Sequence, residues 1–300
     1  MKVLITGATG WLGQAALQAV KKIFPELSKN DLYLYASRER LHSDPSYGVV
    51  KINELTSSKN LPQNLDMFVA LALKTRDYAQ KMGKYEYLEI NEKLIHKHIE
   101  LLESTNPKNV VLISSGVVSK FFEGTGALDS YTEIKLLEEK LFNEFAKKTN
   151  AKLIVLRLWG ATGELMTEPL KYAIGNLIYQ AETSDQIVID SEFEVYRRYI
   201  DATQMFEVLI HALQKNVSAT LNSGGVTVEI GALAELISSK HKKTKRIVRH
   251  LDLTREPDLY IPTDSDFDNL ANSLGISILG LQDQVALTTK SVKQAMKNRT

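Results

Sequence analysis

The segment Val3-Leu4-Ile5-Thr6-Gly7-Ala8-Thr9-Gly10-Trp11-Leu12-Gly13 joins a short apolar run to three glycines spaced three residues apart. The apolar run predicts a buried strand, and the residues after the last glycine have the periodicity of a helix. Glycines at such a turn adopt dihedral angles closed to other residues and let the backbone approach a pyrophosphate, which the N–H groups of the new helix then face. The residues predicted to form this dinucleotide-binding turn are Gly7, Thr9, Gly10, Trp11, Leu12 and Gly13.

Short β-rich runs alternate with helical patterns outward from this turn. The expected strands are 2–6, 32–36, 48–52, 66–72, 109–114 and 152–158. The expected helices run from Gln14 to Ile23, from Glu89 to Leu102 and from Tyr131 to Lys148. This alternation is typical of βαβ units, so the sequence predicts an α/β fold with a doubly wound parallel sheet of the Rossmann type.

The helix expected from Tyr131 to Lys148 has a clear apolar stripe. Residues at three- and four-residue spacing predict its buried face: Ile134, Leu137, Leu141 and Phe145. The charged residues between them are expected to face water: Glu138, Glu139, Lys147 and Lys148.

The alternation fades after Gly163. The segments expected beyond it are a helix at 164–183, a strand at 186–190 and a helix at 227–239. We expect residues 1–163 to form the NAD(P)-binding domain, with about 195–225 returning to it, and residues 164–300 to form a smaller substrate-binding lobe. No internal repeat or low-complexity linker is visible, so the two lobes are expected to pack together.

Composition excludes several classes of function. The 37 Lys and Arg residues balance 36 Asp and Glu residues, so the chain lacks the positive field of a general nucleic-acid binder. The absence of cysteine excludes disulfides, thiolate metal sites and cysteine nucleophiles. No export signal is visible, and apolar stretches such as 67–73 are shorter than the roughly 18 residues that span a bilayer. We therefore expect a soluble, cytoplasmic protein with no nucleic-acid partner, no membrane span and no metal site.

The end of the second expected strand indicates which cofactor is bound. The sequence there is Tyr35-Ala36-Ser37-Arg38-Glu39-Arg40. A carboxylate at this place binds a ribose 2′-OH, whereas a hydroxyl and a guanidinium suit a 2′-phosphate. Ser37 and Arg38 therefore favour NADP(H), and NAD(H) is the alternative if Glu39 takes the ribose.

Two Tyr-x-x-x-Lys matches occur, and only one suits catalysis. Tyr47 and Lys51 fall at an expected strand, where residues four apart are well separated, while Tyr131 and Lys135 lie one turn apart on an expected helix. An ammonium beside a phenol favours the phenolate, which helps a tyrosine exchange protons with a substrate.

Two hydroxyls end the strand expected at 109–114. Ser114 and Ser115 fall at the carboxyl edge of the sheet, where open α/β sheets bind ligands. Ser115 could hydrogen-bond a reacting oxygen there. The simpler interpretation is strand termination, with Tyr131 as a packing aromatic.

Together these residues resemble the extended short-chain dehydrogenase/reductases, the NAD(P)-dependent epimerase/dehydratase group that acts largely on nucleotide sugars. The resemblance covers most of the chain. It rests on Gly7, Gly10, Gly13, Ala70-Leu71-Ala72, Asn91, Ser115, Tyr131, Lys135, Leu156-Arg157-Leu158-Trp159-Gly160 and Arg197-Arg198-Tyr199-Ile200.

The resemblance implies a role for each matching residue. Tyr131 would be the general acid/base, and Lys135 would tune it and hold the nicotinamide ribose. Ser115 would polarise the substrate oxygen, and Asn91 would position Lys135 through water.

The resemblance also implies binding residues. Arg197 would bind a substrate diphosphate, with Arg198 as the alternative shifted by one residue. Asn53 and Glu54 would contact the adenine, and Leu71 would line the cofactor.

Departures from the family pattern narrow the reaction. Gly116-Val117 replaces the Asp-Glu pair that the 4,6-dehydratase branch needs, and the chain lacks the cysteine that the GDP-fucose synthase branch carries at the position of Gly116. Carbonyl reduction and 4-epimerisation remain. A net reductase most often uses NADPH, and Ser37 and Arg38 favour that cofactor, so reduction is the preferred reaction. By the resemblance we expect an oxidoreductase of a nucleotide-linked 4-keto-6-deoxy sugar, an activity found in polysaccharide biosynthesis.

Three other functions stay open, and so does the oligomeric state. The alternatives are an NAD-dependent nucleotide-sugar 4-epimerase, a reductase of a non-nucleotide carbonyl and a non-catalytic NADP-sensing regulator. Members of the family commonly dimerise through helices flanking the sheet, so the resemblance implies a homodimer through the segments containing Asn91 and Tyr131.

Two weaker features are expected to face water. His96 and His98 lie on nearly opposite sides of an expected helix, so they are unsuited to share a metal and are expected in solvated or capping positions. The basic run 240–246 is expected to be a solvated loop, with contact to an anionic substrate, partner or membrane as the alternative.

Overall fold

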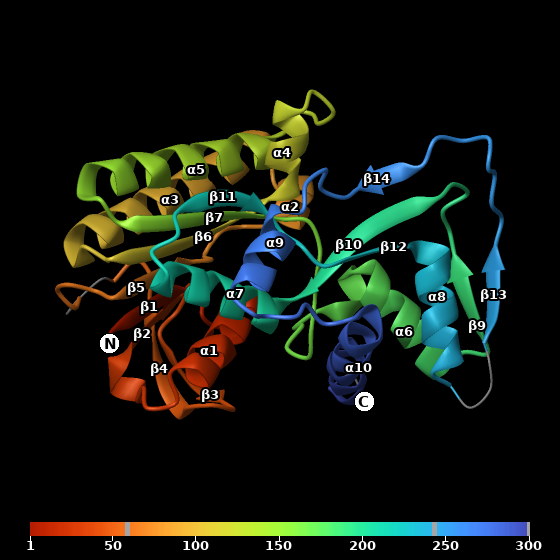
Figure 1. Cartoon of the computed structure of the whole chain (residues 1–300), viewed down its shortest axis with the longest axis horizontal. Helices are drawn as coiled ribbons and strands as arrows, with labels where there is room; N and C mark the ends of the chain where they lie inside the picture. Colours follow the sequence, from red (N-terminus) through yellow and green to blue (C-terminus); the bar gives the residue numbers. More distant parts are fainter. Residues whose placement is uncertain (58–60, 242–244, 299–300) are drawn as a thin grey trace. The chain divides into compact units, whose positions relative to one another are not determined.

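The computed structural model describes residues 1–57, 61–241 and 245–298 (Figure 1). The chain divides into two compact units. The first comprises Met1–Leu158 and Phe206–Asn222, and the second comprises Trp159–Met205 and Ser223–Thr300. The segment from 195 to 205, expected to return to the first domain, thus belongs to the second unit.

The first unit is built on an eight-stranded sheet in the order β11-β7-β6-β5-β1-β2-β4-β3. Every neighbouring pair is parallel except β3 with β4. The strands are β1 (Val3–Thr6), β2 (Leu32–Ala36), β3 (Arg40–Asp44), β4 (Gly48–Glu54), β5 (Met67–Ala70), β6 (Asn109–Ser115), β7 (Lys152–Leu158) and β11 (Ala219–Asn222). The predicted doubly wound parallel sheet is therefore confirmed.

Helices cover both faces of this sheet. In Figure 1, α3 (Lys84–Thr105) and α5 (Ser130–Thr149) lie on one face, and α1 (Trp11–Ile23) and α7 (Ala202–Gln214) lie on the other. Between α3, α5 and the sheet, buried side chains such as Phe68, Leu102 and Phe142 form one core. Two short helices, α2 (Arg76–Lys81) and α4 (Gly116–Phe122), follow the ends of β5 and β6.

The strand β3 was not predicted from the sequence. It is an edge strand that pairs only with β4 and carries the charged residues Arg40 and Asp44. Charge on an edge strand discourages pairing with other chains, but it also weakens the apolar pattern by which strands are predicted.

The second unit has its own sheets and core. Its strand β10 (Val195–Asp201) pairs with β12 (Val226–Glu229), β14 (Asp258–Tyr260) and β8 (Ala161–Thr162), and β9 (Gln186–Ile189) pairs with β13 (Arg246–Arg249). The helices are α6 (Ala173–Thr183), α8 (Ile230–Ser239), α9 (Asp266–Ser273) and α10 (Leu281–Lys297). Apolar side chains of α6, α8 and α10 form a core with those of β9 and β10.

Two expected helices begin later than the sequence predicted. The segment 164–183 is helical only from Ala173, apart from a short 3-10 turn at Pro169–Lys171, because Pro169 disfavours helical dihedral angles in Glu168. The segment 227–239 starts inside β12, and α8 begins at Ile230, where the Glu229 side chain accepts a hydrogen bond from the Gly231 N–H at 2.5 Å.

The basic run 240–246 falls partly outside the described residues, because 242–244 are not described. Lys245 donates to the carbonyl of Ser184 at 2.8 Å, so at least this residue of the run is tied to the fold. Among the described helices, none has the length and apolar character needed to cross a membrane. The described residues also contain no group of three or more His, Asp or Glu side chains placed to hold a metal ion.

Candidate active site

The glycine turn between β1 and α1 is closely packed. Gly7 has φ +67°, in the left-handed region that favours glycine, and a Cβ on it would lie 3.0 Å from the backbone of Leu71. A Cβ on Gly13 would lie 2.3 Å from the Gly7 carbonyl oxygen and 2.6 Å from the Ala8 Cα. Both positions therefore need glycine, because any larger side chain would displace backbone atoms.

The start of α1 suits an anion. Gly10 is its N-cap and provides no side-chain cap, and the first turn of the helix contains no acidic residue. Unpaired backbone N–H groups and the positive end of the helix dipole attract negative charge. Gly7, Gly10 and Gly13 thus form a turn that suits the pyrophosphate of a dinucleotide, and binding of the cofactor there stays a prediction.

The side chain of Thr6 joins the glycine turn to the end of β5. Its Oγ1 accepts hydrogen bonds from the N–H groups of Leu71 at 3.0 Å and Ala72 at 3.3 Å. The sheet order changes direction between β1 and β5, and such switch points bind nucleotides in open α/β sheets. Leu71 therefore lies beside the glycine turn, and its contact with a cofactor stays a prediction.

Most predicted site residues of the first unit lie at one edge of its sheet. Gly7, Leu71 and Ser115 follow or end the parallel strands β1, β5 and β6, so they share the carboxyl edge. Ser37 and Arg38 follow β2 at the same edge, and Asn53 and Glu54 end β4, which is parallel to β2. The topology thus brings together residues that are far apart in the sequence.

The two residues predicted to select the cofactor are exposed. Ser37 and Arg38 stand directly after β2 with exposed side chains. Glu39, the alternative ribose ligand, forms an ion pair with Lys51 at 3.1 Å. Asn53 donates from Nδ2 to the Leu34 carbonyl at 3.4 Å, which ties the end of β4 to β2.

The two Tyr-x-x-x-Lys matches differ as predicted. Tyr131 and Lys135 both lie in the first two turns of α5, whereas Lys51 lies within β4 and Tyr47 just before it. Tyr131 is half-buried and packs against the cluster of Tyr87, Ile95 and Ile134, and after burial and Glu138 it is a further influence on the pKa of Lys135. Only the pair on α5 is therefore placed to act together.

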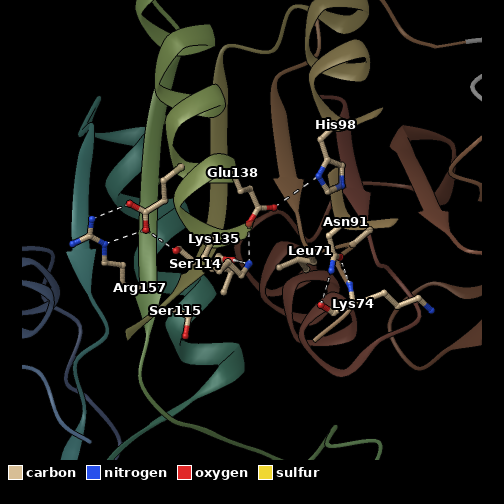
Figure 2. A network of polar contacts seen from close by, with 12 residues as sticks. Leu71, Lys74, Asn91, His98, Ser114, Ser115, Lys135, Glu138 and Arg157 are labelled. Carbon is tan, nitrogen blue, oxygen red and sulfur yellow. Dashed lines mark hydrogen bonds and ion pairs between the residues drawn. The ribbon is translucent and has the colours of Figure 1, made fainter. Parts of the chain in front are cut away.

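Lys135 is buried and held by the protein (Figure 2). Its Nζ donates to the carbonyl of Ile113 at 2.9 Å and to Oε2 of Glu138 at 2.8 Å. Burial opposes the charged form most strongly, but Glu138, Tyr131 and Glu139 together outweigh it, with Glu138 first among them, so the pKa of Lys135 is raised. Lys135 is thus a buried cation with a matched counter-charge.

Glu138 and His98 are both buried, so the expectation that they face water is wrong. Glu138 is 1% exposed and His98 is 0% exposed, and Nδ1 of His98 lies 4.0 Å from Oε1 of Glu138. The imidazole is packed edge-on between Phe68 and Phe142, with ring centroids 6.2 and 6.1 Å away. Burial and, to a lesser extent, the charge of Lys135 lower the pKa of His98 to about 3, so it is neutral at pH 7.

Glu139 was also expected in water and is buried. Its carboxylate binds Arg157 of β7 through two hydrogen bonds, from Nε at 3.0 Å and from Nη2 at 2.8 Å. Ser114 donates to the same carboxylate at 2.5 Å. This network clamps α5 to the carboxyl ends of β6 and β7, and so fixes the helix that carries Tyr131.

Ser115 and Asn91 lie near this network (Figure 2). Ser115 caps α4 by accepting from the Val117 N–H at 3.5 Å. Asn91 is buried in α3, where its Oδ1 accepts from the Lys74 N–H at 2.8 Å and its Nδ2 donates to the Tyr87 carbonyl at 3.2 Å. Asn91 therefore anchors the segment after β5, and its expected water-mediated link to Lys135 stays a prediction.

Arg197 and Arg198 lie in β10 of the second unit, each paired with an acid. Arg197 binds Asp258 at 2.6 Å and is 5.8 Å from the ring centroid of Tyr260. Arg198 is more buried and binds Asp268. Of the two, Arg197 is therefore the more accessible to a ligand.

A model of the NAD dependent epimerase/dehydratase family matches residues 3–231. No curated protein matches the chain at a significant level.

Several solved structures share the fold across nearly the whole chain. One is UDP-glucuronic acid 4-epimerase from Bacillus cereus in complex with NAD, with a TM-score of 0.70, 17% identity, and coverage of 98% of this chain and 97% of that chain. UDP-N-acetylglucosamine 4-epimerase from Bacillus cereus has a TM-score of 0.73 and 18% identity, and the match covers 99% of this chain and 96% of that chain. A dTDP-glucose 4,6-dehydratase from Streptomyces venezuelae, with NAD bound, has a TM-score of 0.73 and 12% identity, and the match covers 99% of this chain and 98% of that chain. At these identities the likeness shows the fold.

Proposed function

We propose that this protein, a member of the NAD-dependent epimerase/dehydratase family, reduces a nucleotide-linked 4-keto-6-deoxy sugar with NADPH. It is an NAD(P)-dependent enzyme of the extended short-chain dehydrogenase/reductase type. The observation that carries the choice of reduction is the exposed Ser37-Arg38 pair after β2, which suits the 2′-phosphate of NADPH. A reductase must exchange its cofactor at every turnover, and NADPH is the usual reductant.

Bound NADPH would supply the hydride, and residues of this chain would donate the proton and stabilise the charge that develops. The phenol of Tyr131 gives its proton to the carbonyl oxygen of the sugar, to which Ser115 donates a hydrogen bond. The ammonium of Lys135 stabilises the phenolate that remains and holds the nicotinamide ribose. Gly7, Gly10 and Gly13 hold the pyrophosphate, and Leu71, Asn53 and Glu54 line the nucleotide.

The cofactor that the purified protein retains tests the choice of reaction. A 4-epimerase regenerates its NAD within each turnover and keeps it bound, whereas a reductase releases NADP. We expect protein purified without added nucleotide to contain less than one equivalent of cofactor and to bind added NADPH. Stoichiometric tightly bound NAD would instead support the 4-epimerase.

Arg38→Ala tests the cofactor preference. We expect the KM for NADPH to rise about tenfold or more, because a charge-assisted contact with the 2′-phosphate is lost, while the KM for NADH stays nearly constant. Steady-state kinetics with both cofactors measures this change. Arg40→Ala removes the same charge two residues away and is the matched control. Equal effects of Arg38→Ala on NADPH and NADH would refute the 2′-phosphate contact.

Arg197→Met tests recognition of a diphosphate. We expect the KM for the nucleotide sugar to rise about tenfold or more, with a smaller change in kcat, because a fork of donors to the phosphates is removed. Arg255→Met, at an exposed arginine paired with Glu192, is the control in the same unit. An unchanged KM would favour a non-nucleotide carbonyl as substrate, which the pairing of Arg197 with Asp258 also allows.

The homodimer expected through α3 and α5 stays a prediction, as do the cytoplasmic location and the link to polysaccharide biosynthesis.

A further inference from the structure

We propose that Glu138 is a positioning residue for Lys135: its buried carboxylate keeps the ammonium charged and fixed beside the end of β6, where the lysine serves the cofactor and Tyr131. The inference rests on the proposed function, in which Lys135 contacts the nicotinamide ribose. Glu138 itself acts through Lys135 and needs no contact with substrate.

The geometry supports this role directly. Glu138 is one turn after Lys135 on α5, so the two side chains share a face of the helix. An ammonium has three donors, and the protein uses two of them, one to Ile113 and one to Glu138. These two bonds restrict the rotation of a flexible side chain and direct the third donor.

The charges around the pair show why a carboxylate is needed there. The other titratable groups coupled to the pair are His98 on α3 and Tyr131 and Glu139 on α5, and Arg157 of β7 faces them through its ion pair with Glu139. The carboxylate of Glu139 is bound by Arg157 through two hydrogen bonds and acts on Lys135 only from a distance. Glu138 is the acid that contacts Lys135 directly and is the larger of the two effects on its charge.

The charge state of His98 leaves Glu138 to Lys135. Although its Nδ1 is 4.0 Å from Glu138, burial keeps the imidazole neutral at pH 7, so it does not compete for the carboxylate. Burial raises the pKa of Glu138 as well, and Lys135 opposes that effect. Each member of the Lys135–Glu138 pair thus favours the charge on the other.

Removing the carboxylate has a definite effect on pH dependence. In a Glu138→Gln variant, burial, the largest effect on the ammonium, is opposed by Tyr131 and Glu139 without the help of Glu138, so we expect the pKa of Lys135 to fall below that of an unfolded lysine, about 10.4. The free energy of unfolding then rises with pH between the lowered value and that of the unfolded chain. In the native protein, where the pKa of Lys135 is raised, this contribution is instead fully present below the unfolded value and lost at higher pH.

The test compares Glu138→Gln and Glu138→Asp with the native protein and with Glu144→Gln, an exposed glutamate of the same helix. Two measurements are made from neutral to alkaline pH: the free energy of unfolding by denaturant, and the dissociation constant of NADPH from its fluorescence. In Glu138→Gln we expect stability to rise with pH relative to Glu144→Gln, and NADPH binding to weaken from a pH at least about one unit lower than in the native protein. Glu138→Asp moves the carboxylate away from Lys135 by one methylene, so it should shift the pH dependence of stability and of NADPH binding in the same direction but by less. If Glu138→Gln does not fold, the two pH profiles of Glu138→Asp test the proposal.

Two results would overturn the proposal. Stability profiles of the Glu138 variants that match Glu144→Gln would mean that Glu138 does not hold the charge of Lys135. Altered stability with an unchanged pH dependence of NADPH binding would reduce the pair to a structural contact. Neither measurement uses a sugar substrate, so they test the role of Glu138 alone. Failure of the proposed sugar reduction would be seen separately, in turnover assays.

Discussion

Tyr131→Phe should lower kcat by about 10²–10⁴-fold and leave NADPH binding and the melting temperature nearly unchanged. The substitution removes only the hydroxyl that gives its proton to the substrate oxygen. The ring remains and still packs against Tyr87, Ile95 and Ile134. Since Lys135 is held by Ile113 and Glu138, its place does not depend on the phenol.

Tyr47→Phe is the matched control, because Tyr47 belongs to the other Tyr-x-x-x-Lys sequence. Its hydroxyl is buried and has no hydrogen-bond partner among the described residues, and burial raises its pKa to about 12. We expect turnover of this variant to equal that of the native protein. Comparable activity in Tyr131→Phe and Tyr47→Phe would refute the catalytic role of Tyr131.

Gly13→Ala should weaken cofactor binding strongly. Its new Cβ would lie 2.3 Å from the Gly7 carbonyl oxygen, so the glycine turn must move away from α1. Overpacking of this kind typically costs about 1–3 kcal/mol, and displacement of the turn also disrupts the N–H groups that face the pyrophosphate. We expect the dissociation constant of NADPH to rise by at least about tenfold, with a lower melting temperature.

Gly83→Ala provides the comparison for Gly13→Ala. Gly83 is the N-cap of α3, and a Cβ on it would meet no atom within 4 Å. This substitution should leave NADPH binding unchanged, as titration of cofactor fluorescence would show. Native-like affinity in Gly13→Ala would show that the turn does not cradle the cofactor.

Local sequence patterns predicted six of the eight strands in the sheet of the first unit, and missed β3 and β11. The strands in its interior, such as β1, β5 and β6, contain buried apolar runs, so they are visible without knowledge of the fold. The glycine turn was visible because each glycine has a steric reason. β3 was not, because an exposed edge strand has no apolar pattern to detect.

The buried charges near the site were beyond the same reasoning. The sequence places Glu138, Glu139 and His98 in water because the prediction considers the polarity of each residue without its partners from other segments. In the structure Glu139 is buried because Arg157 comes from β7, and Glu138 because Lys135 is itself buried. Such pairs depend on contacts between distant segments, although an acidic residue one turn after a predicted catalytic lysine is a signal that could have been used.

The most direct test of the central claim is NADPH consumption by the purified protein with a panel of 4-keto nucleotide sugars, with NADH and Tyr131→Phe as comparisons. The account predicts turnover with at least one of these sugars, faster with NADPH than with NADH and lost in Tyr131→Phe. Tight NADPH binding without consumption on any member of the panel would contradict it.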